Sequence, residues 1–145
     1  MSDSEENICR GFRGYVTLNS FGGYNIPAAV QNIIMRNYAS NKGLNLKLSF
    51  NEHRFQNCFV QLKDLLKELP NLGGVLMCSI FMLPVDRGQR QVIYDQFLEN
   101  EASLHFVLEN KILRDVNDIA YVEEILAISL TLKACPTSIQ AEAML

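Results

Sequence analysis

Residues 14–31, GYVTLNSFGGYNIPAAVQ, decide the fold prediction. A β-rich run at 15–18 leads into a polar, glycine-bearing turn at 19–25, and a helix is predicted to begin at about Pro27. In open α/β proteins, loops of this kind lie outside the carboxyl end of the sheet, where free N–H groups at a helix start can receive a ligand. The stretch therefore predicts where a site lies without naming its chemistry.

Strand and helix patterns alternate along the rest of the chain. Apolar residues three and four apart predict helices near 27–42, 59–69, 87–100 and 117–133, and the buried stripe expected for the first of these is Ile26, Val30, Ile33, Ile34 and Tyr38. Residues 44–50 alternate as an outer strand does, while 75–83 are apolar almost throughout, as in a central parallel strand; 104–108 is the fourth strand. This order predicts one flavodoxin-like, resolvase-like α/β sandwich of three layers. Its mostly parallel sheet has four or five strands, with order 2-1-3-4 favoured.

The length of 145 residues and the 48% hydrophobic content suit one domain, predicted over residues 10–134. Residues 1–9 read as a flexible acidic terminus, and 135–145 as a loose tail. The last predicted helix, 117–133, has an apolar face broader than one stripe. Such a face needs more core or another subunit, which predicts a homo-oligomer through this C-terminal helix.

Charge and cysteine spacing exclude several classes. The net charge of −3 and the pI near 5.4 come without a basic run, so no nucleic-acid partner is predicted. Cys9, Cys58, Cys78 and Cys135 are irregularly spaced, which favours neither a zinc site nor a disulfide framework, and no metal or cofactor is expected. The acidic N-terminus and the short apolar run at 75–85 predict a cytoplasmic protein without membrane insertion.

Parallel strands would bring the loops 19–25, 51–56, 83–89 and 109–114 to one edge of the sheet. Three side chains there are the catalytic candidates: Ser20 as a nucleophile, His53 as a base, and Glu109 as a base or a ligand of a sugar hydroxyl. The candidate substrate-binding residues are Arg13, Gly22, Gly23, Asn25, Gln31, Arg54, Asn110 and Arg114. Together they suit a polar, phosphorylated small molecule.

Each candidate also has a structural interpretation. Ser20 and its glycines can simply shape a turn, His53 can be a surface histidine, and Glu109 can cap the end of a strand. His105, inside a strand, is expected to be structural, and Arg36 to be a solvated helix residue.

Two family resemblances add to this picture. The motifs G-F-R-G-Y-V, S-F-G-G, N-I-P-x-x-V-Q-N-x-x-x-R-N-Y, L-K-E-L-P-N-L-G-G-V and L-H-F-V-L-E-N resemble the sporadic carbohydrate cluster family of bacterial surface-polysaccharide loci. This resemblance implies an enzyme that acts on a phosphorylated or nucleotide-activated sugar for lipopolysaccharide, capsule or a related glycan. The alternative is a non-catalytic sugar-binding or scaffold protein of the same pathway.

The second resemblance is architectural. The first strand, Ser20, the helix with Gln31 and the L-H-F-V-L-E strand are similar to the catalytic domain of serine recombinases, in which the serine attacks a DNA phosphate and arginines stabilise it. Here Leu18 stands two before Ser20 in place of an arginine, and F-M-L-P-V-D-R follows the central strand without a matching arginine pair. The third interpretation is therefore a degenerate serine-recombinase-like domain.

Overall fold

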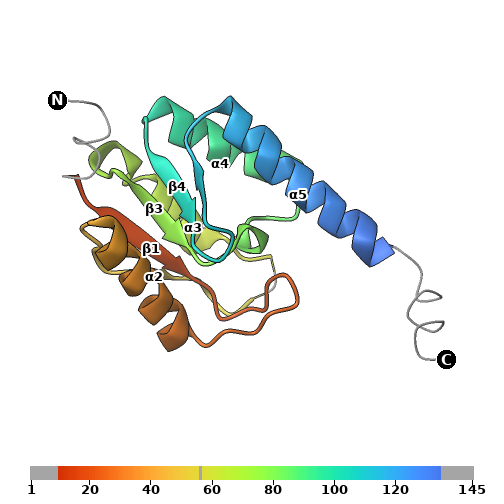
Figure 1. The fold of residues 1–145 in the computed structure, drawn as a ribbon, viewed down its shortest axis with the longest axis horizontal. Coiled ribbons are helices and arrows are strands. Elements are labelled where there is room, and N and C mark those ends of the chain that lie inside the picture. The colour runs from red at the N-terminus through yellow and green to blue at the C-terminus, as the bar shows by residue number, and fades with distance from the viewer. Residues whose placement is uncertain (1–9, 56, 135–145) are drawn as a thin grey trace.

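The structure is a computed structural model that describes residues 10–55 and 57–134, so the expectations for 1–9 and 135–145 lie outside it. Its sheet has five strands in the order β2-β1-β3-β4-β5, which confirms the predicted order (Figure 1). Each strand pairs in parallel with its neighbour except β5, which is antiparallel to β4. The strands are β1 (Phe12–Val16), β2 (Phe50–Asn51), β3 (Gly74–Met77), β4 (Ser103–Phe106) and β5 (Lys111–Leu113).

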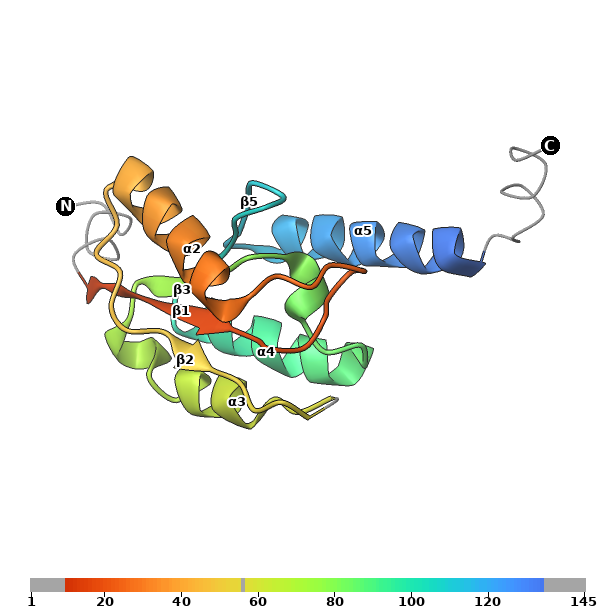
Figure 2. The ribbon, with the colours of Figure 1, turned by 90° about the horizontal axis from the view of Figure 1, so that it is seen from below.

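Helices cover both faces of the sheet. Helix α2 (Ala28–Lys42) lies on one face, and α3 (Val60–Leu66) and α4 (Arg87–Glu99) lie on the other, as Figure 2 shows. Short 3₁₀ turns, η1 (Leu69–Asn71) and η2 (Ile80–Met82), flank β3. Every residue of β3 and β4 is buried, which agrees with the expectation that the apolar run at 75–83 is covered on both sides.

The face that α2 buries differs from the predicted stripe. Val30 and Ile33 are exposed, and the buried residues are Gln31, Met35, Tyr38 and Ala39. The carboxamide of Gln31 explains the rotation: its Oε1 accepts the Thr17 N–H at 3.2 Å, and its Nε2 donates to the Thr17 carbonyl at 2.6 Å. A buried polar anchor therefore selects the inward face, because unpaired backbone groups at the end of β1 would be costly.

Two predicted strand boundaries are wrong. The alternating segment 44–50 enters the ladder only at β2 and at an isolated bridge between Leu46 and Phe12. Its alternation also breaks, because Leu48 is 80% exposed while Ser49 turns inward and donates to Asn32 Oδ1. The predicted strand 75–83 ends at Met77, where Ser79 caps η2 by accepting the Phe81 N–H.

The expected strand-to-helix loop at 109–114 is instead a hairpin. Residues 107–110 form its turn, with Asn110 at a φ of 51° and its N–H bonded to the Val107 carbonyl, and β5 then runs back along β4. The pairing of Leu113 with Leu104 puts Arg114 at the amino end of the parallel strands. The fourth predicted loop therefore has Glu109 and Asn110 at the carboxyl edge and Arg114 at the opposite edge.

His105 is structural, as the sequence predicts. It lies in β4 between the Tyr38 hydroxyl, 2.7 Å from Nδ1, and the Ser103 hydroxyl, 2.9 Å from Nε2. Burial lowers the pKa of His105 to about 4, with smaller effects from the charges of Arg114 and Lys42. The imidazole is therefore a neutral part of the core.

Helix α5 (Val116–Ala134) is joined to the body by the core residues Ile119 and Val122 and by a buried ion pair of Glu123. The Arg90 guanidinium donates to both carboxylate oxygens of Glu123, at 2.9 and 3.1 Å, and to the carbonyls of Pro84 and Val85. Beyond this anchor α5 extends past the carboxyl end of the strands (Figures 1 and 2). Among the described residues, no helix is long and apolar enough to cross a bilayer.

Replacing Gln31 by leucine tests the polar anchor of α2. Gln31→Leu keeps the side chain buried but leaves the N–H and C=O of Thr17 without partners, so the free energy of unfolding should fall by about 2–4 kcal/mol. Urea unfolding measures the loss. As a control, Asn37→Leu changes an exposed amide of the same helix and should cost less than about 0.5 kcal/mol. Equal effects of the two variants would contradict the anchor.

Candidate functional site

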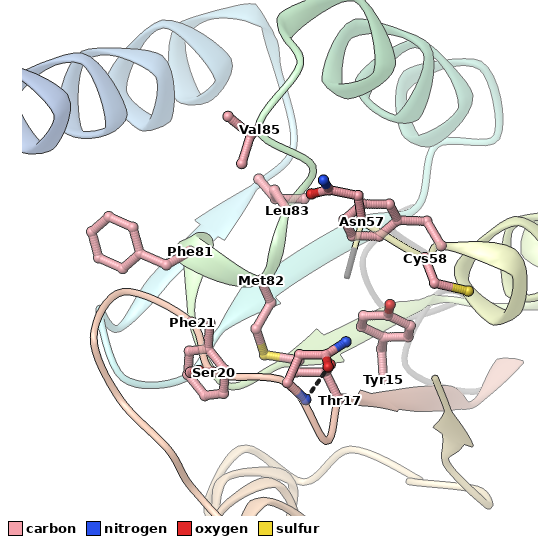
Figure 3. A pocket seen from close by; sticks show the side chains of 12 residues that line it. Tyr15, Thr17, Ser20, Phe21, Asn57, Cys58, Phe81, Met82, Leu83 and Val85 are labelled. Carbon is pink, nitrogen blue, oxygen red and sulfur yellow. Dashed lines mark hydrogen bonds between the residues drawn. The ribbon is translucent and has the colours of Figure 1, made fainter. Parts of the chain in front are cut away.

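A cavity of about 260 Å³ surrounds Ser20 at the carboxyl edge of the sheet. In Figure 3, Thr17, Ser20 and Phe21 lie along one side of it, and Leu83 and Val85 lie along the other. Its lining combines hydroxyl and amide groups with three phenylalanines: Tyr15, Thr17, Asn19, Ser20, Phe21, Asn57, Cys58, Phe59, Phe81, Met82, Leu83 and Val85. We call it the Ser20 pocket.

The glycines after Ser20 form a tight turn. Phe21 and Tyr24 exchange backbone hydrogen bonds at 2.9 and 2.8 Å, and Gly22 and Gly23 between them have φ of 56° and 82°. Positive φ at both central positions is the geometry that glycine adopts most readily. A Cβ on Gly22 would also lie 2.7 Å from the Phe81 ring. The glycines thus explain the shape of the loop, and neither lines the Ser20 pocket.

A buried carboxylate, Glu52, lies behind the lining of the pocket and contacts the lining residues Tyr15 and Cys58. It is 3% exposed, and it accepts the Tyr15 hydroxyl at 2.8 Å and the N–H groups of His53, Gln61 and Leu62 at 3.1 Å each. These bonds tie the end of β1 to the loop after β2 and to the start of α3. Glu52 therefore fixes the positions of the pocket-lining Tyr15 and Cys58, whose thiol lies 3.6 Å from it.

Hydrogen bonding sets the charge of this pair. Burial by itself would raise the pKa of Glu52, but the bonds from Tyr15 and from the three backbone N–H groups outweigh it, so the pKa is lowered and the group is a carboxylate. Burial, followed by the hydrogen bond to Glu52, raises the pKa of Tyr15, which is a neutral phenol. Both carboxylate oxygens of Glu52 already accept hydrogen bonds, so the group is poorly placed to act as a general base.

The structure does not bring the three catalytic candidates together. Ser20 is exposed and lines the pocket, whereas His53 and Arg54 are exposed on the loop after β2 and do not line it. Glu109 lies at the carboxyl edge, but it accepts the Ser79 hydroxyl at 2.6 Å and the Ile80 N–H at 3.3 Å. This geometry matches the capping interpretation of Glu109.

The substrate-binding candidates are also dispersed. Arg13 pairs with Glu68 at 3.0 Å, Gln31 is the buried anchor of α2, and Arg114 lies at the opposite end of the sheet. Asn25 is exposed before α2, and Asn110 is in the β4–β5 turn. Of all the predicted site residues, Ser20 alone lines the Ser20 pocket. A functional role for the others stays a prediction.

Among the described residues that line the Ser20 pocket there is no arginine, lysine or histidine. An arginine pair does follow the central strand, on the first turn of α4, but Arg90 is committed to Glu123. Arg87, two residues beyond the pocket-lining Val85, is exposed with its Nε 3.9 Å from a Glu123 oxygen. Glu123 therefore balances only one of these two positive charges, and Arg87 keeps most of its guanidinium exposed.

Sequence reasoning missed Glu52 and Cys58 as parts of the site. Both belong to a segment without periodicity, and Glu52 stands eight residues before the first residue of α3, so no local capping signal marks it as the acceptor for that helix. Within the described residues, Cys58 and Cys78 are free thiols, and no group of three or more His, Cys, Asp or Glu side chains could hold a metal ion.

Three solved recombinase structures are similar to this chain in fold. The N-terminal catalytic domain of TP901-1 integrase matches with a TM-score of 0.65 at 13% identity, over 86% of this chain and 96% of that one. A resolvase family site-specific recombinase from Streptococcus pneumoniae matches with a TM-score of 0.60 at 11% identity, over 91% and 99%. The C-terminal catalytic domain of ISC1926 TnpA, an IS607-like serine recombinase, gives 0.52 at 14%, over 80% and 97%. No family model and no curated protein matches this chain.

These neighbours correct the functional predictions. The resolvase-like architecture is confirmed, whereas the carbohydrate-cluster resemblance has no support, and the prediction of a sugar-modifying enzyme with a sugar partner is wrong. The exclusion of nucleic acid is also overturned, because the neighbours are recombinases, which act on DNA. Net charge was a poor guide to a nucleic-acid partner because it describes the whole chain, whereas nucleic-acid binding depends on the local charge of one surface.

Replacing Glu52 by glutamine tests the support of the pocket. Glu52→Gln removes a buried charge that accepts several hydrogen bonds, so the free energy of unfolding near neutral pH should fall by about 2–4 kcal/mol. Because its pKa is lowered on folding, the contribution is complete above the ordinary value of about 4.5 and is lost as the pH falls further. The difference between wild type and variant should therefore shrink below that pH in urea titrations.

Glu99→Gln is the matched control, because Glu99 is an exposed carboxylate at the end of α4. It should change stability by less than about 0.5 kcal/mol. A stability difference for Glu52→Gln that stays constant down to acidic pH would contradict the carboxylate role.

Proposed function

We propose that this chain is a serine-recombinase-like domain that works in a DNA-bound protein assembly and does not itself cleave DNA through Ser20. The fold shared with recombinase catalytic domains supports the class of protein. The Ser20 pocket, which has a serine but no basic side chain, supports the loss of cleavage.

The missing charge is the observation that carries the proposal. Attack on a phosphodiester spreads negative charge over the phosphate oxygens, and enzymes stabilise that charge with arginine, lysine or metal ions. A serine also needs a base to become an effective nucleophile. The lining of the Ser20 pocket supplies neither a cation nor a free carboxylate, and Glu52 beneath it has its oxygens occupied.

The assembly role rests on α5. Tyr121, Ile125, Ile128 and Leu132 recur at four- and three-residue steps, which makes one continuous apolar seam. Ile128 and Leu132 are 53% and 66% exposed, on the part of α5 that extends from the body. Each large apolar side chain that becomes buried contributes about 1.5–3 kcal/mol. Pairing of two α5 seams from two copies of the chain covers this face, since a self-complementary seam suits a two-fold dimer.

Ser20→Ala tests the absence of cleavage. Wild type and variant are each mixed with a labelled pool of duplex DNA and run on denaturing gels, with Ser40→Ala, an exposed serine of α2, as control. We expect no covalent protein–DNA adduct with any of the three proteins, and salt-sensitive DNA binding by all of them in mobility-shift assays. An adduct formed by wild type and Ser40→Ala but lost in Ser20→Ala would contradict the proposal. Absence of DNA binding at low salt would contradict its DNA component.

Charge in the seam tests the dimer. Ile128→Glu should convert the chain from dimer to monomer in sedimentation velocity, because pairing would bury two like charges. Ile33→Glu places the same charge at an exposed isoleucine of α2, 63% exposed, and should leave the dimer intact. A wild-type chain that sediments as a monomer at every concentration would contradict the role of α5.

A further inference from the structure

A second polar pocket, of about 270 Å³, lies between α2 and the segment that precedes and forms β2. Its lining shares no residue with the Ser20 pocket and consists of Asn32, Arg36, Leu46, Lys47, Leu48, Ser49 and Asn51. We propose that this pocket, the α2–β2 pocket, binds a phosphate group.

Two cationic residues line it without a counter-charge. Arg36 and Lys47 are both exposed, neither has an ion-pair partner among residues 10–55 and 57–134, and no acidic residue lines the pocket. Elsewhere in the described chain, Arg13 and Arg90 bind carboxylates at 3.0 and 2.9 Å. The charge of the α2–β2 pocket is therefore available to a ligand.

Hydrogen bonds to β1 and α2 hold in place the segment that carries Lys47. The Lys47 N–H donates to the Phe12 carbonyl at 2.8 Å, the Leu48 carbonyl accepts Arg13 Nη1 at 2.7 Å, and the Ser49 hydroxyl donates to Asn32 Oδ1 at 2.8 Å. Asn32 and Arg36 are four residues apart on α2 and so share one face of that helix. A pocket whose walls are already positioned loses little entropy when it binds a ligand.

The donor set selects the ligand chemistry. A guanidinium and an ammonium with the nearby carboxamide of Asn51 offer several N–H donors and no free carboxylate, which suits an anion with several oxygens, as in phosphate. The exposed side chain of Leu48, with Leu46 beside it, gives the group attached to the phosphate an apolar wall. The volume is just below the range of about 300–1,000 Å³ of drug-sized sites, so it fits one nucleotide unit better than a longer ligand.

The phosphate has two candidate sources, a DNA backbone or a small phosphorylated molecule. The first rests on the proposed function, and the second does not. Phosphate binding from either source does not involve Ser20. The failure of the phosphate site is therefore distinguishable from the failure of the proposed function.

Titration of the ¹⁵N-labelled full chain tests the site. Inorganic phosphate, a nucleoside monophosphate and a short DNA duplex are added separately, with chloride at matched ionic strength as the reference. We expect saturable shifts of the amide signals of residues 47–51, and binding at least about tenfold weaker in Arg36→Gln/Lys47→Gln, a loss of about 1.4 kcal/mol. Both side chains are exposed, so the thermal midpoint of this variant should match wild type.

Lys63→Gln is the matched control, because Lys63 is an exposed lysine on α3, on the opposite face of the sheet. It should bind phosphate as wild type does. DNA that shifts the same signals, with a salt slope reduced by about 1 in the double variant, identifies a backbone phosphate; shifts from the small probes alone identify a small ligand. No saturable shift with any probe, or unchanged shifts in the double variant, would overturn the phosphate site.

Discussion

The pairing of the Gln31 carboxamide with the backbone of Thr17 is the constraint on which the ligand-facing edge of the sheet depends. The ladder of β1 ends at Val16, whose carbonyl accepts the Glu52 N–H. The next residue, Thr17, lies beyond the registers that pair β1 with β2 and β3. Gln31 takes the place of a strand there by accepting from and donating to Thr17. This pairing sets the rotation of α2 and joins the two ends of the loop that carries Ser20. The position of the serine thus follows from a polar contact behind it.

Glu52 has the corresponding role on the other side of β1, since it binds Tyr15 and the backbone at the start of α3. In both cases a buried polar side chain satisfies backbone groups that open sheet edges and helix starts leave unpaired. Three of the charged groups near this edge are consequently structural: Glu52 and Glu109 accept backbone N–H groups, and Arg90 binds Glu123 of α5. Among the described residues, no charged side chain lines the Ser20 pocket, and this is the observation on which the proposed loss of cleavage rests.

The features that can engage partners lie outside that pocket. Helix α5 presents an apolar seam beyond the body, and the α2–β2 pocket presents two cations without carboxylates. Both are compatible with a domain that contributes surfaces to an assembly while its pocket stays chemically quiet. The negative net charge conceals the second feature, because the 16 acidic residues of the chain outnumber its 13 basic residues and offset the local excess of positive charge.

By itself the sequence determined the class of fold, the strand order and the approximate bounds of α2 and α4, because hydrophobic periodicity is a local signal. Only the tertiary structure decided which face α2 buries, that the strand after Glu109 turns back, and which residues surround Ser20. The physical reason is sequence separation: Glu109 meets Ser79 30 residues away, and Glu123 meets Arg90 33 residues away. No local pattern encodes such polar partners, so side chains that share a sheet edge in a prediction can each be committed to a different structural contact.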